Sequence, residues 1–294
     1  MKRKGMLMKK IGITVDCVCD LPEKYLEEHD IGIVYYYITT STGMFRDGYE
    51  ITSENILEYL ENGGGRAITN PPSPKEYKAV FENALEHYDE VVHFSLSEKI
   101  DSTTHNAKVA LGLMGENGKR VTVIDSEHLS TGIGHLIINA VEMRDGGSSL
   151  AEIVEVSESM RSRIANSYMT PSIDYLFHNG RLDKRIKRIG DLLGIYPVIT
   201  LKTGRITLKG FILGNYENAV LRYIRKMLKH NDKIDKRRLS ITHAGCTVRM
   251  LSRVREEVDK LCSFDEVIVT KASATISSNS GPGAIGIQFV WKDC

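Results

Sequence analysis

Short apolar runs alternate with amphipathic stretches along the first half of the chain. The run Ile11 to Val15 is typical of a buried strand, and Ile33 to Ile38, rich in Val, Ile and Tyr, predicts a second one. Between them, Pro22 to His29 has the pattern of a helix, with Asp20 as the expected N-cap. The chain therefore begins with a strand, a helix and a strand.

The same alternation continues to about residue 124. Further helices are expected at Thr52 to Glu61, Pro74 to Tyr88 and Thr103 to Met114, and further strands at Glu90 to Phe94 and Arg120 to Ile124. Ser73 is the expected N-cap of the second of these helices. Strands separated by helices of about ten to fifteen residues need crossover connections, which predicts a parallel sheet.

The second half has a different pattern, because it begins with two adjacent strands. Leu193 to Leu201 and Ile206 to Leu213 flank Lys202-Thr203-Gly204-Arg205, which predicts a hairpin. Helices are then expected at Glu217 to Lys229 and Val248 to Leu261, and strands at Leu239 to Thr242, Val267 to Thr270 and Ile285 to Trp291. This order predicts a mixed sheet covered by helices. We place the domain boundary after the polar helix Leu150 to Arg163, giving domains 8–165 and 166–294.

Length and charge narrow the functional class. A chain of 294 residues fits two domains of ordinary size, and its net charge of +1 gives no electrostatic case for nucleic acid. No apolar run approaches the roughly 20 residues that span a bilayer, so no membrane insertion is expected. The basic N-terminus lacks the apolar segment of a secretory signal. Five irregularly spaced cysteines favour a reducing, cytoplasmic location.

A glycine-rich turn near the C-terminus is the most informative local feature. Three glycines and a proline between Gly281 and Gly286 exclude the interior of a helix or strand. They predict a tight turn that leads directly into the last strand. Because such a turn has few side chains, its N–H groups can approach an anion closely.

Other segments accompany this turn in a fixed order. They are Asp16-Cys17-Val18-Cys19-Asp20, Arg46-Asp47-Gly48, Ile68 to Pro74, Ser95-Leu96-Ser97, Asp125-Ser126, Tyr175 to Leu182 and Leu192 to Ile199. Together with Gly281-Pro282-Gly283, they resemble the DegV family, whose better-studied members are the bacterial fatty-acid-binding FakB proteins. The resemblance implies an α/β/α domain with a parallel sheet, a second α/β domain with a mixed sheet, and an apolar ligand tunnel between them.

The resemblance also implies a function and a set of site residues. Thr69, in the proline-rich segment, and Ser97, in a loop after a strand, match residues that bind the fatty acid carboxylate. Arg181 matches an arginine near the head group. The expected ligand-binding set is completed by Asn279, Ser280, Gly281 and Gly283. The implied protein is a carrier without cofactor or metal that binds a long-chain fatty acid and presents it to a fatty acid kinase.

The chain departs from the FakB pattern at residues close to the expected site. Asn279 stands where that pattern has a histidine, and an asparagine can form hydrogen bonds but cannot carry a charge. Glu98 and Asp101 replace serines and bring negative charge near an expected anion site. A basic stretch expected at 214–217 lacks its arginines. These changes weaken the case for the kinase partner more than the case for an apolar ligand, and they leave a different head group or a different partner as alternatives.

An enzyme is the alternative from another functional class. His243 ends an expected strand and has Cys246 nearby, while Cys17 follows Asp16, so a small-molecule hydrolase or transferase could use these side chains. The spacing of Cys17 and Cys19 is not that of a zinc or redox site. A third reading is a regulatory protein for which the lipid is a signal.

Overall fold

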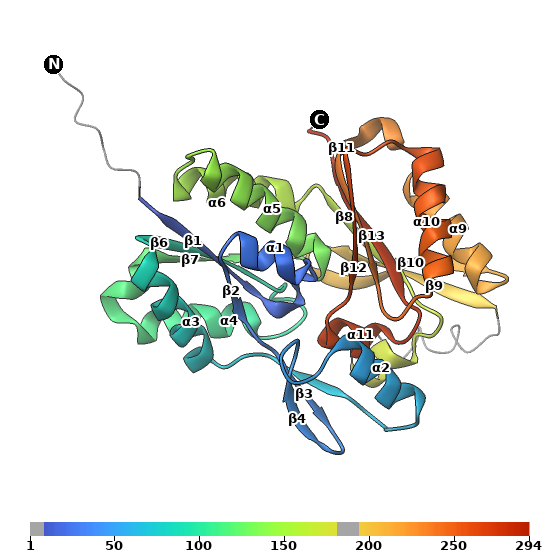
Figure 1. Cartoon of the computed structure of the whole chain (residues 1–294), viewed down its shortest axis with the longest axis horizontal. Coiled ribbons are helices and arrows are strands. Elements are labelled where there is room, and N and C mark those ends of the chain that lie inside the picture. Colours follow the sequence, from blue (N-terminus) through green and yellow to red (C-terminus); the bar gives the residue numbers. More distant parts are fainter. Residues whose placement is uncertain (1–8, 181–193, 294) are drawn as a thin grey trace.

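Two β-sheets form the framework of the protein (Figure 1). The computed structural model describes residues 9–180 and 194–293. The first sheet has four strands in the spatial order β2 (Ile31–Val34), β1 (Ile11–Asp16), β6 (Glu90–Ser95) and β7 (Val121–Asp125). All three pairings are parallel, which confirms the parallel sheet predicted from the alternation of strands and helices.

Helices cover both faces of this sheet (Figure 1). One face packs against α3 (Pro74–His87) and α4 (Thr103–Leu113), with α3 contributing Tyr77 and Phe81. The other face packs against α1 (Glu23–Glu28), α5 (Thr131–Asp145) and α6 (Leu150–Arg161). The predicted start of α3 is confirmed, since the Glu76 carboxylate accepts the N–H of the N-cap residue Ser73 at 2.7 Å.

The second sheet is mixed, as predicted. Its strands follow the order β10 (Arg205–Leu213), β9 (Ile195–Lys202), β8 (Ile164–Met169), β13 (Ile285–Trp291), β11 (Ile234–His243) and β12 (Glu266–Lys271). Only β11 and β12 pair in parallel. One face is covered by α9 (Tyr216–Met227) and α10 (Val248–Leu261). The predicted hairpin is confirmed, with Thr203 and Gly204 at positive φ in its turn.

Some local predictions were wrong. The expected single strand Ile33 to Ile38 is broken, because β3 (Tyr37–Thr40) leaves the parallel sheet. It pairs instead with β4 (Gly43–Arg46) and β5 (Ile68–Asn70) in a small antiparallel sheet. Asp20 does not cap α1, since Pro22 occupies the N-cap position and Asp20 has left-handed backbone angles.

The remaining elements of residues 9–180 and 194–293 are short. They are helices α2 (Ser53–Glu61), α7 (Asp174–His178) and α11 (Ala274–Ser280), and the 3-10 helices Cys17–Cys19, Gly115–Arg120 and Asn231–Lys233. In Figure 1, α2 and α11 lie below the two main sheets, beside the small one.

Helix α5 lies between the two large sheets (Figure 1). At its start, the Thr131 hydroxyl donates to Gln288 Oε1 on β13 at 2.6 Å. Just before it, Asn166 Nδ2 on β8 donates to the Leu129 carbonyl at 2.7 Å. A Cβ on Gly132 would lie only 2.2 Å from that Asn166 nitrogen, so the close approach requires glycine. The predicted domain boundary falls at the start of β8 and remains a prediction.

Candidate functional site

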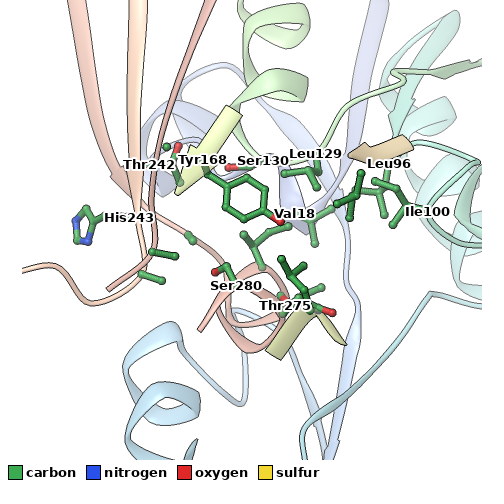
Figure 2. Close-up of a pocket in the computed structure, with 18 of the residues that line it drawn as sticks. Val18, Leu96, Ile100, Leu129, Ser130, Tyr168, Thr242, His243, Thr275 and Ser280 are labelled. Carbon is green, nitrogen blue, oxygen red and sulfur yellow. Dashed lines mark hydrogen bonds between the residues drawn. The ribbon is translucent and has the colours of Figure 1, made fainter. Parts of the chain in front are cut away.

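An apolar cavity lies among residues of the segments that follow the strands of the first sheet, of the second sheet itself and of α11 (Figure 2). The space between its surrounding atoms is about 680 Å³, its opening to solvent included. The apolar side chains that line it include Val18, Leu96, Ile100, Leu129, Leu176 and Ile206. Leu96 and Ile100 come from the loop after β6, where a parallel sheet is expected to bind ligands.

Among the described residues that line the cavity, those with a buried side-chain polar atom lacking a hydrogen-bond partner lie on α11. Asn279 and Ser280 line the cavity, and their Oδ1 and Oγ atoms are buried without a hydrogen-bond partner among the described residues. Thr275 Oγ1 also lacks a hydrogen bond of good geometry, although it lies beside the Asp47 carboxylate. Buried polar atoms are nearly always paired in folded proteins, so unpaired ones on one wall of a cavity indicate a place for a polar ligand group.

Two buried carboxylates hold the start of α11. Asp47 accepts the N–H groups of Ala274 at 3.0 Å and Thr275 at 2.8 Å. Asp20 accepts the Ser273 N–H at 2.7 Å and the Ser130 hydroxyl at 2.5 Å. Burial raises the pKa of both carboxyl groups, that of Asp20 to about 7. The segments around Asp20 and Asp47 therefore position the helix that carries the polar groups of the cavity.

The N–H groups of the glycine-rich turn form hydrogen bonds within the protein. The Gly281 N–H donates to the Ser277 carbonyl at 2.8 Å, and the Gly283 N–H donates to the Ala244 carbonyl at 2.7 Å. Both glycines have positive φ. Both N–H groups therefore already donate to carbonyl groups of the protein. The sequence, in contrast, predicts that they are open to an anion. The turn contributes by setting the positions of Asn279 and Ser280 at the end of α11.

The other predicted ligand residues lie in different surroundings. Ser97 is fully buried, and its hydroxyl donates to the Gly204 carbonyl of the β9–β10 turn at 2.8 Å. Thr69 is half-buried on β5, a strand that packs beside α11. Neither is among the described residues that line the cavity. Arg181 lies outside the described residues.

The two acidic departures from the family pattern differ in position. Glu98 is exposed and pairs with Lys99 at 2.9 Å, and this neighbouring cation lowers the pKa of the Glu98 carboxyl group. Asp101 lines the cavity and accepts the Tyr36 hydroxyl at 2.9 Å. Only Asp101 therefore brings a carboxylate to the wall of the cavity.

The side chains of the enzyme alternative are poorly suited to nucleophilic catalysis. His243 lines the cavity, but Figure 2 shows its ring set apart from the other labelled side chains. Its Nδ1 accepts the Cys246 N–H at 3.3 Å, and burial lowers its pKa. Burial raises the pKa of the Cys246 thiol to about 12 and also raises that of Cys17. Both thiols are therefore protonated at neutral pH, the unreactive form.

Alkylation of Cys246 tests this conclusion. A pKa of about 12 instead of 9.0 reduces the thiolate fraction near neutral pH about 1000-fold. We expect iodoacetamide to modify Cys246 in the native protein at least that much more slowly than in the denatured protein, as measured by peptide mass spectrometry. Similar rates in the two states would contradict the conclusion and favour the enzyme alternative.

Comparisons with known proteins place the chain in a family. The model of the DegV family of uncharacterised proteins matches residues 10–292. The chain belongs to the DegV family. It is 29% identical to a DegV domain-containing protein of Caldanaerobacter subterraneus subsp. tengcongensis, over 97% of this chain and 100% of that protein. This confirms the family predicted from the ordered motifs.

Solved structures of proteins described as binding fatty acids share the fold. A fatty-acid-binding DegV family protein of Thermus thermophilus is 27% identical, with a TM-score of 0.84, over 96% of this chain and 100% of that one. A stearic-acid-binding protein of Eubacterium ventriosum is also 27% identical, with a TM-score of 0.84, over 97% and 99% of the two chains. The DegV fold that the sequence predicts is therefore confirmed.

Two negative findings concern the described residues alone. Within residues 9–180 and 194–293, no helix has both the length and the apolar character needed to cross a membrane. Over the same ranges, no three His, Cys, Asp or Glu side chains come together in a way that could hold a metal ion.

Proposed function

We propose that this DegV protein binds a long-chain fatty acid, with the tail in the apolar cavity and the acid group beside α11. The observation that carries the proposal is an apolar cavity whose lining includes Asn279 and Ser280, residues with buried side-chain oxygens that have no hydrogen-bond partner among the described residues. Two relatives of the same fold, each 27% identical, are described as binding fatty acids. In this role the protein is a carrier that does not transform its ligand.

Burial of the tail supplies most of the affinity. Each methylene removed from water contributes about 0.8 kcal/mol, so a tail of about fourteen carbons offers about 11 kcal/mol before the cost of ordering it. The apolar side chains come from separate parts of the chain, among them Val18, Leu129 and Ile206. The polar contacts then determine the orientation of the ligand more than its affinity.

The other residues predicted from the sequence have different roles in this proposal. Thr69 is a ligand group in this proposal, because its strand packs beside α11. Ser97 would have to exchange its bond to the Gly204 carbonyl for one to the ligand. Gly281 and Gly283 support Asn279 and Ser280 through the shape of the turn. Arg181, the fatty acid kinase partner and the cytoplasmic location remain predictions from the sequence.

The direct test is to identify what the purified protein carries. The protein is purified natively and denatured in organic solvent, and the released compounds are analysed by mass spectrometry. A fatty acid in a near-stoichiometric amount is the expected result. A protein that releases no lipid and takes up no fatty acid of any chain length would refute the proposal.

Substitution in the wall of the cavity provides a second test. Ile206 lies half-buried on β10 and lines the cavity, so the larger side chain of Ile206→Trp should occupy space that the tail needs. We expect the affinity for a long-chain fatty acid to fall by about tenfold or more, measured by displacement of a fluorescent acyl probe. The matched control is Leu213→Trp on the same strand, where the side chain is 61% exposed. Equal affinities of the two variants would contradict the assignment of the cavity.

A further inference from the structure

The orientation of the Asn279 amide determines what the cavity offers to a ligand. Asn279 Nδ2 lies 2.8 Å from the Thr275 carbonyl oxygen, which can only accept a hydrogen bond. The nitrogen must therefore be on that side, and the amide cannot be turned over without placing two acceptors against each other. The buried atom left without a partner among the described residues is Oδ1, which can only accept. Asn279, a residue of the cavity lining, thus carries a buried acceptor that lacks a donor among the described residues.

Among the described residues, neither Ser280 nor Asp101, which line the same cavity, donates a hydrogen bond to Asn279 Oδ1. Ser280 Oγ is buried and also unpaired, and as a hydroxyl it can either donate or accept. Asp101 adds a carboxylate to the same cavity, and its Oδ2 already accepts the Tyr36 hydroxyl. None of the described residues that line the cavity is a lysine or an arginine. These residues favour a ligand group that brings a hydrogen to share rather than a full negative charge.

We infer that the polar end of the ligand at α11 is neutral and donates a hydrogen bond to Asn279 Oδ1. Two kinds of long-chain lipid have this chemistry: an acid bound as the neutral carboxylic acid, and a primary alcohol. The O–H of either group donates to Asn279, and its oxygen accepts from the Ser280 hydroxyl. An ionised carboxylate has no hydrogen for Asn279 and would stand in the same cavity as the Asp101 carboxylate. The inference rests on the proposed function, because it requires a long tail in the cavity.

The inference predicts an order of affinities among ligands that share one tail. Hexadecan-1-ol, hexadecanoic acid and methyl hexadecanoate are compared by displacement of a fluorescent acyl probe from the wild-type protein at about pH 8, where the dissolved acid is ionised. The alcohol should bind about tenfold more tightly than the ester, which has no hydrogen to donate and leaves Oδ1 unpaired. The alcohol should also bind more tightly than the acid, which must take up a proton to bind. An acid that binds tenfold more tightly than the alcohol would overturn the inference, as would equal affinities of the alcohol and the ester.

Removing the acceptor Asn279 Oδ1 should remove the preference for the alcohol over the ester. Asn279→Leu is close in shape but has no oxygen, so we expect its affinities for the alcohol and the ester to agree within about twofold. Asn62→Leu, on the exposed residue at the end of α2, is the matched control and should keep the wild-type ratio. An Asn279→Leu protein that keeps the ratio would contradict the inference. If that variant does not fold, the comparison of ligands on the wild-type protein decides alone.

The outcomes separate the inference from the proposal on which it rests. If none of the three ligands displaces the probe, both the fatty-acid proposal and the inference fail. If all three bind with the same affinity, the tail is bound as proposed, and only the assignment of a neutral, donating polar end fails.

Discussion

Asp47→Ala is expected to lower the free energy of unfolding by about 3 kcal/mol and to weaken the binding of a long-chain lipid. The side chain is 1% exposed and accepts two N–H groups at the start of α11, those of Ala274 and Thr275. Its loss leaves two buried donors unpaired, and each costs about 1–3 kcal/mol. For two donors the cost is about 2–6 kcal/mol. Because burial raises the pKa of this carboxyl group, removing it also relieves a desolvation cost, and the expected net loss lies in the lower part of the range for two donors.

The accompanying loss of binding follows from the position of Asp47. The carboxylate does not line the cavity, but it fixes the helix that carries Asn279 and Ser280. Denaturant unfolding measures the stability, and displacement of an acyl probe measures the affinity. Asp47→Asn keeps one acceptor and should lose less stability and less affinity than Asp47→Ala. Glu54→Ala removes an exposed carboxylate from α2 and serves as the control. If Asp47→Ala lowered the free energy of unfolding by less than about 1 kcal/mol, α11 would not depend on this contact.

The elements predicted best are those with a clear local signal in the sequence. Helix α10 has the predicted bounds Val248 to Leu261, because its apolar residues recur on one face and Thr247 caps its first turn. Strand β13 also has its predicted bounds, since the preceding Gly-Pro-Gly turn marks where it begins. In both cases a local signal is enough to place the element.

Helix α5 was missed for the opposite reason. Ten of its fifteen residues are buried, among them Ile133, Leu136 and Ile137, because it lies between two sheets. A helix that is apolar on all sides has no period of 3.6 residues to detect. The break between β2 and β3 was missed because Ile33 to Ile38 is uniformly suited to a strand, and only tertiary packing assigns its parts to different sheets.

The candidate site was predicted in part. Asn279 and Ser280, found through the turn that follows them, do line the cavity. Thr275 was not predicted, because a threonine within a short helix has no sequence signal of its own. The contacts that place this helix join residues far apart in the chain, such as Asp47 and Thr275. The bond between Ser97 and the Gly204 carbonyl is equally remote, so a matching motif could not show that the hydroxyl was already engaged.

Gly281→Ala is expected to destabilise the protein by about 3 kcal/mol or more and to reduce its affinity for lipid. Gly281 has φ 80° and ψ 167°, a backbone region that is essentially restricted to glycine. A Cβ at this position would also lie 2.2 Å from Tyr175 Cδ2, well inside van der Waals contact. Strain and steric overlap therefore act together, immediately after Ser280. Thermal and denaturant unfolding measure the first effect, and probe displacement measures the second.

Two comparisons separate strain from overlap at this turn. Gly283 also has positive φ, but its Cβ would meet Pro171 at 3.1 Å, so Gly283→Ala should cost less than Gly281→Ala. In a Tyr175→Ala background the ring is absent, and Gly281→Ala should then cost only its backbone strain, about 1–3 kcal/mol. An unchanged cost in that background would mean that strain alone makes Gly281 necessary. A cost close to zero would mean that the ring alone does, and that the turn tolerates a side chain wherever α7 leaves room for it.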